Sequence, residues 1–221
     1  MAKREAGGAD TYGRLTTLRR SVWSALLFAA VCIGGVFLHE LGHAVGGWLQ
    51  GIAVVPTPAK EYILRAQVDW QEMAWIALGG VAATTLVVVG SIGWYLRQRN
   101  QVADVVLAGV LVPPLVYTVR FLLVGRGHDG VEWQAAQAAI GVAPSGHALD
   151  VLFACLLLAG GTAWIVRRHS SLRLLSLVKA VGLMFFGIVL LVVIQVINNV
   201  AFDRFFPSTQ TLNQPSTLDA R

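Results

Sequence analysis

Two histidines and a glutamate stand at residues 39–43 with the spacing His-Glu-x-x-His. In a helix, positions four residues apart lie on one face, so the rings of His39 and His43 could both reach one metal ion. Zinc accepts histidine nitrogen and, in catalytic sites, keeps one coordination position for water. Glu40 stands beside the first ligand, where its carboxylate could take a proton from that water. The spacing therefore predicts a hydrolytic zinc site with one ion per chain.

The motif lies inside an apolar run that extends from Val22 to about Leu49. Ionisable side chains are costly inside a bilayer, and where they occur they usually serve a function. Two histidines and a glutamate facing lipid would be hard to tolerate. We therefore favour a metal site over the alternative that these are only buried core residues with polar partners.

The composition is that of a membrane protein. Hydrophobic residues make up 56% of the 221 residues and charged residues only 13%, and the mean hydropathy is +0.65. A soluble domain usually has about 25% charged residues, so this chain has too few to cover a water-facing surface. The net charge of +5 is explained by basic loops, and no basic stripe with interleaved aromatic residues suggests a nucleic-acid partner.

Five apolar runs are long enough to cross about 30 Å of hydrocarbon. They predict transmembrane helices at about 21–49, 73–96, 103–124, 148–166 and 174–201, between a basic, partly disordered tail at 1–20 and a polar tail at 202–221. Lys and Arg predominate in the first tail and in the second and fourth loops, which places the N-terminus in the cytoplasm. The composition suits a bacterial inner membrane.

The loop at 50–72 is expected to hold a small β-hairpin. Pro56 and Pro58 exclude a helix there, and apolar and polar residues alternate over 61–69 as in a strand. That strand could bind an unwound substrate along its edge or simply cover the metal site. Residues 131–143 could form a short helix at the membrane interface. The predicted fold is thus an all-α polytopic membrane protein with one hairpin after the first helix.

Zinc needs a third protein ligand, and the run that follows the third apolar segment is where we expect it. With the N-terminus inside, the first and third helices both run outward, so this run meets the histidine motif near one face. Asp129 is the first choice as ligand. His128 and Glu132 are the alternatives, and one of them could instead orient a ligand.

Three further polar residues in apolar segments are candidates for supporting roles. Arg120 could pair with a carboxylate near the metal, stabilise an oxyanion, or extend to the lipid headgroups. Asn198 and Asn199, with Gln195, give the last helix a polar face. Hydrogen bonds between helices are the favoured role of that face, and contact with a substrate backbone is the alternative.

The motif His-Glu-Leu-Gly-His-Ala in an apolar segment, with a later Asp-Gly, resembles the site-2 protease family of intramembrane metalloproteases. In that family the aspartate of the Asp-Gly motif is the third ligand, which maps onto Asp129. The family also has a β-element after the first helix and then a glycine-rich helix, similar to residues 52–70 and 78–82 here. The resemblance covers roughly residues 22–135. The family's site generally faces the cytosol, whereas the charge pattern here places the motif nearer the outer face.

The resemblance implies a zinc metallopeptidase that hydrolyses a peptide bond of a protein substrate in or at the lipid bilayer. Two other functions remain open. A metal-binding membrane protein or transporter would use the same histidines without a strict need for Glu40. A non-catalytic membrane interaction module of the same fold would bind a partner and cleave nothing.

Overall fold

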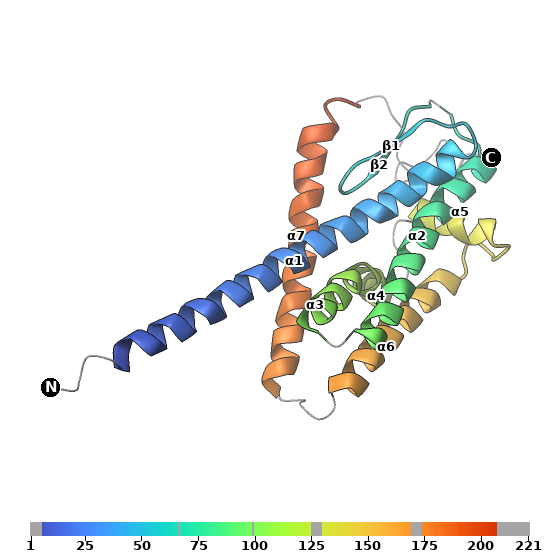
Figure 1. Ribbon diagram of the computed structural model, residues 1–221. Coiled ribbons are helices and arrows are strands. Elements are labelled where there is room, and N and C mark those ends of the chain that lie inside the picture. Colours follow the sequence, from blue (N-terminus) through green and yellow to red (C-terminus); the bar gives the residue numbers. More distant parts are fainter. Residues whose placement is uncertain (1–5, 66, 99, 125–129, 169–173, 207–221) are drawn as a thin grey trace.

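The computed structural model describes residues 6–65, 67–98, 100–124, 130–168 and 174–206, which form seven helices and a two-stranded sheet (Figure 1). The elements are α1 (Ala6–Trp48), β1 (Val54–Pro56), β2 (Glu61–Ile63), α2 (Trp70–Arg97), α3 (Gln101–Val110), α4 (Val112–Val124), α5 (Gly130–Ala139), α6 (Ala148–Arg168) and α7 (Leu174–Phe202). The mostly helical fold with a small hairpin after the first helix agrees with the sequence.

Five segments of the described chain are helical, apolar and long enough to cross a membrane, in agreement with the expected number. They lie at 19–48, 70–97, 101–123, 148–167 and 181–202. Many large apolar side chains on these segments are exposed, for example Leu86 at 72% and Leu158 at 69%. Water would not tolerate so much exposed apolar surface, so the fold is consistent with a membrane protein.

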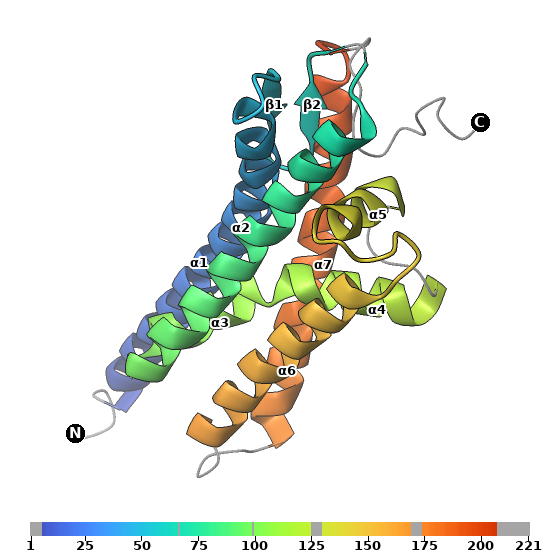
Figure 2. The ribbon, with the colours of Figure 1, turned by 90° about the vertical axis from the view of Figure 1, so that its right-hand side faces the viewer.

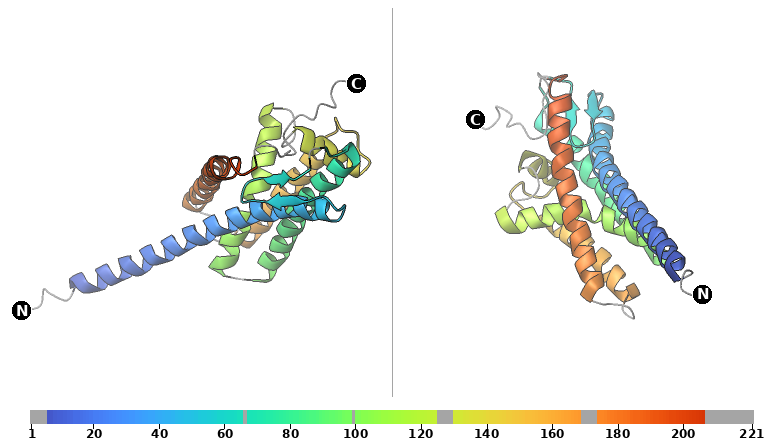
Figure 3. Two further views of the ribbon diagram at one scale, coloured as in Figure 1. Left: turned by 90° about the horizontal axis from the view of Figure 1, so that it is seen from above. Right: turned by 90° about the vertical axis from the view of Figure 1, so that its left-hand side faces the viewer.

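The third apolar segment is two helices rather than one. It breaks at Leu111, between α3 and α4, two residues before Pro113 and Pro114. A proline has no N–H to donate and its ring clashes with the carbonyl four residues earlier, which interrupts a helix. Figures 2 and 3 show that α4 runs across α7 and the other long helices instead of alongside them. The expected helix at 103–124 is therefore present as a membrane-length apolar segment, but it is divided into two helices of different direction.

Two other boundaries differ from the sequence-based expectation. The helix at the N-terminus begins at Ala6, so residues 6–20 extend α1, whereas the sequence predicted a helix from about residue 21. The second helix begins at Trp70, because Asp69 accepts a hydrogen bond from the Glu72 backbone and the Glu72 side chain accepts one from the Asp69 backbone. This reciprocal pair is a capping box, which fixes where a helix starts.

The closest helix pair is α1 with α2, and glycines allow it. A Cβ placed on Gly42 would lie 2.4 Å from the backbone oxygen of Gly79, and one placed on Gly79 would lie 2.2 Å from that of Gly42. Gly46 meets the backbone of Trp75 in the same way. No side chain fits between the two backbones here, so the small residues let the helices pack at short distance, as their spacing predicts.

The hairpin pairs β1 with β2 in antiparallel register, with Val54 opposite Ile63 and Pro56 opposite Glu61. Gly51, with φ of +72°, turns the chain out of α1, and the indole of Trp48 donates a hydrogen bond to the Val54 carbonyl. The second strand ends at Ile63, so the expected strand over 61–69 is too long.

The hairpin is joined to the end of α7 by one carboxylate. Asp203 accepts hydrogen bonds from the Lys60 ammonium at 2.5 Å and from the Tyr62 hydroxyl at 2.7 Å. The ring of Tyr62 also packs on Phe206, with centroids 4.7 Å apart. These contacts hold the last helix against β2, as Figure 1 shows where α7 ends near the strands.

We predict that Gly79→Ala destabilises the protein, because the new methyl group would collide with the Gly42 backbone. The expected cost is about 1–3 kcal/mol, which thermal unfolding in detergent would detect. Gly90→Ala is the matched control in the same helix, since a Cβ at Gly90 meets nothing within 4 Å. Equal midpoints for the two variants would contradict the proposed close packing.

The hairpin contact should weaken in acid. Hydrogen bonds from Lys60 and Tyr62 lower the pKa of Asp203. The pKa of this carboxyl group is therefore lower in the folded protein than in the unfolded chain, where it is about 4. The ionised carboxylate stabilises the fold fully above about pH 4. This stabilisation is lost as the pH falls through the pKa of the folded state. Hydrogen-exchange protection of residues 54–63 should therefore fall below about pH 4. In Asp203→Asn protection should be low throughout, and an acid-induced loss of unchanged size in that variant would contradict the role of Asp203.

Candidate metal centre

The two motif histidines lie on one face of α1 and are almost fully buried, at 2% exposed for His39 and 1% for His43. Both rings point at α2. The Nδ1 atom of His39 lies 3.0 Å from the Gly80 carbonyl and 2.9 Å from the Thr84 hydroxyl. The Nδ1 atom of His43 lies 2.8 Å from the Ile76 carbonyl. Helix α2 therefore fixes the orientation of both rings.

These contacts determine which nitrogen carries the proton. A carbonyl oxygen can only accept, so each Nδ1 must donate its hydrogen to α2. The two Nε2 atoms then present lone pairs, and they lie 3.0 Å apart. Two lone pairs so close repel each other unless a cation or a proton lies between them. In a metal-binding histidine, the ring nitrogen that does not bind the metal usually donates its hydrogen to a group such as a backbone carbonyl, as both Nδ1 atoms do here.

A third donor atom completes the group. The Oε1 atom of Glu132 lies 3.4 Å from Nε2 of His39 and 3.2 Å from Nε2 of His43, and its side chain is buried. For ligands about 2.0–2.1 Å from a zinc ion at tetrahedral angles, adjacent donor atoms are about 3.3 Å apart. The three observed separations of 3.0, 3.2 and 3.4 Å fit one face of such a tetrahedron. These buried groups could bind a metal ion.

Aromatic packing holds Glu132 in place. It lies in the first turn of α5, and its neighbour Trp133 is stacked on Phe153 of α6, with ring centroids 5.3 Å apart. Trp133 also meets Tyr117 of α4 at 5.7 Å, and Tyr117 in turn meets the ring of His39 at 5.9 Å. The short helix expected at 131–143 exists as α5 (Gly130–Ala139). It packs mainly on α2, and the ring contacts of Trp133 with α4 and α6 add to this packing, which places the carboxylate beside the histidines.

Space for the second ring depends on a glycine. A Cβ on Gly80 would lie 2.2 Å from Cε1 and 2.4 Å from Nε2 of His43. Any side chain at this position would occupy the place of the imidazole. The glycine-rich segment of α2 therefore does more than allow close packing, since it also makes room for one of the candidate ligands.

A second group of donors adjoins the first and contains Glu40, His43 and Glu61, whose donor atoms all lie within 4.8 Å of one another. All three are buried. Glu40 thus lies beside the candidate ligands, as its place in the motif predicts. Glu61 reaches the same place from β2, so the hairpin contributes a carboxylate to the centre and covers it. Sequence reasoning missed Glu61 because nothing in its local pattern separates it from an ordinary strand residue.

The remaining candidates have different outcomes. Asp129 and His128 lie outside the described residues, as does the side chain of Arg120. Asn198 is buried near the Tyr62 hydroxyl, whereas the Gln195 amide donates to Asn199 within α7 itself, at 3.0 Å. That hydrogen bond lies within one helix, so the expected hydrogen bonding between helices stays a prediction for Gln195 and Asn199.

The arrangement offers two imidazoles and a carboxylate as metal ligands, with further carboxylates beside them to accept a proton. The chain matches no family model, no curated protein and no solved structure. What the centre does must therefore be inferred from its own donor atoms.

We predict that Thr84→Val weakens zinc binding, because the hydroxyl that helps to orient His39 is lost while the side-chain volume is kept. Removing such a supporting group typically costs about 10–100-fold in affinity. We expect a loss in affinity of about 10-fold, because the Gly80 carbonyl still accepts a hydrogen bond from Nδ1 of His39. Competition with a chromogenic chelator would measure the change. Thr85→Val is the control, as Thr85 bonds only within α2, to Val81; an equal effect there would refute this role of Thr84.

Proposed function

We propose that this chain is an intramembrane zinc metallopeptidase, in which His39, His43 and Glu132 hold the ion and Glu40 is the general base. The observation that carries the proposal is the convergence of two histidine Nε2 atoms and one carboxylate oxygen within 3.4 Å, beside a buried glutamate. The sequence resemblance to site-2 proteases points to the same chemistry.

The chemistry requires each residue in a defined role. When bound, zinc would act as a Lewis acid that polarises the scissile carbonyl and lowers the pKa of a water molecule. The carboxylate of Glu40 takes a proton from the attacking water as the new carbon–oxygen bond forms. It then gives that proton to the amide nitrogen as the carbon–nitrogen bond breaks, so that one water is consumed and an acid and an amine are released.

Glu61 has a position that suits a supporting role. Its carboxylate lies close to both Glu40 and His43 and is held there by a hairpin that is itself tied to α7. From this place it can accept a hydrogen bond from the protonated Glu40 or from the amine product. The hairpin then serves as a cover that shields the centre from bulk water, and this favours the covering role over edge pairing with substrate.

The substrate class follows from the surroundings. Helix α1, which carries both histidines, exposes large apolar side chains such as Leu38 and Val45, so a protein segment within or at the bilayer is the substrate that could reach the centre. We place the chain in a bacterial inner membrane with its N-terminus in the cytoplasm, because Lys and Arg predominate in the loops that would face the cytoplasm.

Metal binding without catalysis is the rival function, and it needs no base at Glu40.

We predict about one zinc per chain in the purified protein, with loss of zinc in His39→Ala and full retention in Glu40→Gln. Glu40→Gln should nonetheless lose peptide cleavage by at least about 100-fold, because the general base is gone. Labelled casein in detergent, digested in ¹⁸O-water, would show cleavage as one heavy oxygen at each new carboxyl terminus. His147→Ala is the control histidine, since His147 is exposed.

The same assay decides the third ligand. The resemblance implies Asp129, whereas the geometry favours Glu132, so zinc content should fall in Glu132→Gln and persist in Asp129→Asn. The reverse result would move the ligand to Asp129. Zinc and cleavage both intact in Glu40→Gln would contradict the peptidase mechanism, and absence of zinc from the wild type after reconstitution would contradict the metal centre itself.

A further inference from the structure

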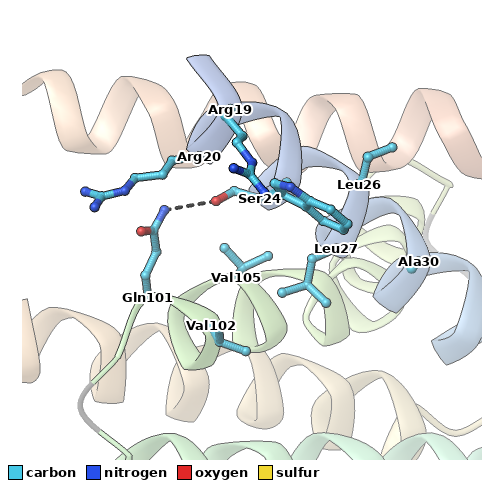
Figure 4. A pocket seen from close by; sticks show the side chains of 10 residues that line it. Arg19, Arg20, Ser24, Leu26, Leu27, Ala30, Gln101, Val102 and Val105 are labelled. Carbon is cyan, nitrogen blue, oxygen red and sulfur yellow. Dashed lines mark hydrogen bonds between the residues drawn. The ribbon is translucent and has the colours of Figure 1, made fainter. Parts of the chain in front are cut away.

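A cavity lies away from the metal centre, between the N-terminal part of α1 and the start of α3. Its volume is about 790 Å³, within the range of sites that hold ligands of several hundred daltons. One end of the cavity is lined by polar and charged side chains and the other by apolar ones. Figure 4 shows Arg19, Arg20 and Gln101 gathered toward one end and Leu26, Leu27 and Ala30 toward the other.

The polar end is suited to an anion. Two guanidinium groups line it, and among the described residues neither forms an ion pair with a carboxylate. The first turn of α3 also lines the cavity, and although it already contains Asp104, the N-terminus of a helix attracts negative charge. The side chain of Gln101 bridges the two helices by donating to the Ser24 hydroxyl at 2.9 Å, which keeps α1 and α3 together at this end.

The apolar end is suited to hydrocarbon. Leu27, Val105 and Ala30 form the walls, and the lining residues Trp23 and Leu26 are 63% and 57% exposed, so the cavity opens to the outside of the bundle. Trp and Arg at the end of an apolar span mark the level of lipid headgroups. The apolar span of α1 begins at Arg19. A ligand here would therefore have its charge at the headgroup level and its tail beside the span.

We propose that this cavity binds an anionic glycerophospholipid, with the phosphate at Arg19 and Arg20 and an acyl chain along Leu27 and Val105. A soluble phosphate would use only the polar end and leave the apolar wall without a role, whereas a neutral lipid would leave the two cations without one. Basic pockets between membrane helices on the cytoplasmic side are known to take such headgroups. The proposal rests on insertion of the chain in a membrane, and it is independent of the peptidase activity.

The test is lipid binding by native mass spectrometry of the full chain, delipidated in a neutral detergent. Dioleoyl phosphatidylglycerol is titrated against dioleoyl phosphatidylcholine, and inorganic phosphate is the soluble anion. We expect clear preference for phosphatidylglycerol and no competition from phosphate at equal concentration. Arg19→Gln and Arg20→Gln should each weaken binding about five-fold, the contribution of one basic residue near an anionic headgroup.

Two matched controls make the test specific. Arg97→Gln removes an exposed arginine at the same basic side but outside the cavity, and should leave binding unchanged. Ala30→Phe fills the apolar end and should abolish selective binding with both arginines present, whereas Ala25→Phe, outside the lining, should not. If Arg97→Gln weakened phosphatidylglycerol binding as much as Arg19→Gln or Arg20→Gln, the lipid would be attracted by basic residues in general, and the proposed site would be overturned. Binding unaffected by Ala30→Phe, effective competition by phosphate, or equal binding of both lipids would also overturn it.

Discussion

The fold depends on the close approach of α1 and α2, where the backbones of Gly42 and Gly79 leave no space for a side chain. In a lipid bilayer, neither helix would gain from burying apolar surface against the other, so close packing would have to supply the association. The same approach brings the carbonyls of Ile76 and Gly80 within reach of the histidine rings. One contact between glycines thus stabilises the helix pair and also selects the nitrogen that each histidine offers to a metal.

The rest of the structure closes the centre from two further sides. Helix α5 presents Glu132 because Trp133 is anchored on Phe153 and Tyr117. The hairpin presents Glu61 and is in turn held by the contacts of Lys60 and Tyr62 with Asp203. Each wall is therefore fixed by packing outside the centre, which leaves the carboxylates pre-positioned, as catalysis by proton transfer requires.

The sequence was most informative where a strict spacing met an apolar setting. The spacing of His39 and His43 predicts one shared helix face, and the five long apolar runs predict the five membrane-length segments, because both depend on local periodicity. The break at Leu111 was foreseeable from Pro113 and Pro114 but not the crosswise direction of α4, which tertiary packing decides. Glu61 and Glu132 come from separate segments, and no local pattern reveals that their carboxylates converge on His43.

Charge balance is the strongest physical reason to expect a cation at this centre. Glu40, Glu61 and Glu132 are all buried around two rings whose Nδ1 hydrogens are already donated to backbone carbonyls. Three buried carboxyl groups can be ionised together only where positive charge, from a metal ion or from protons, compensates for them. A divalent ion at the two Nε2 atoms and Glu132 would offset most of that charge, and it would leave a carboxylate beside it free to exchange a proton. In the proposed peptidase, the ligands and the general base would thus depend on each other: the ion would make it possible to bury an ionised Glu40, and Glu40 would supply the proton transfer that the metal alone does not.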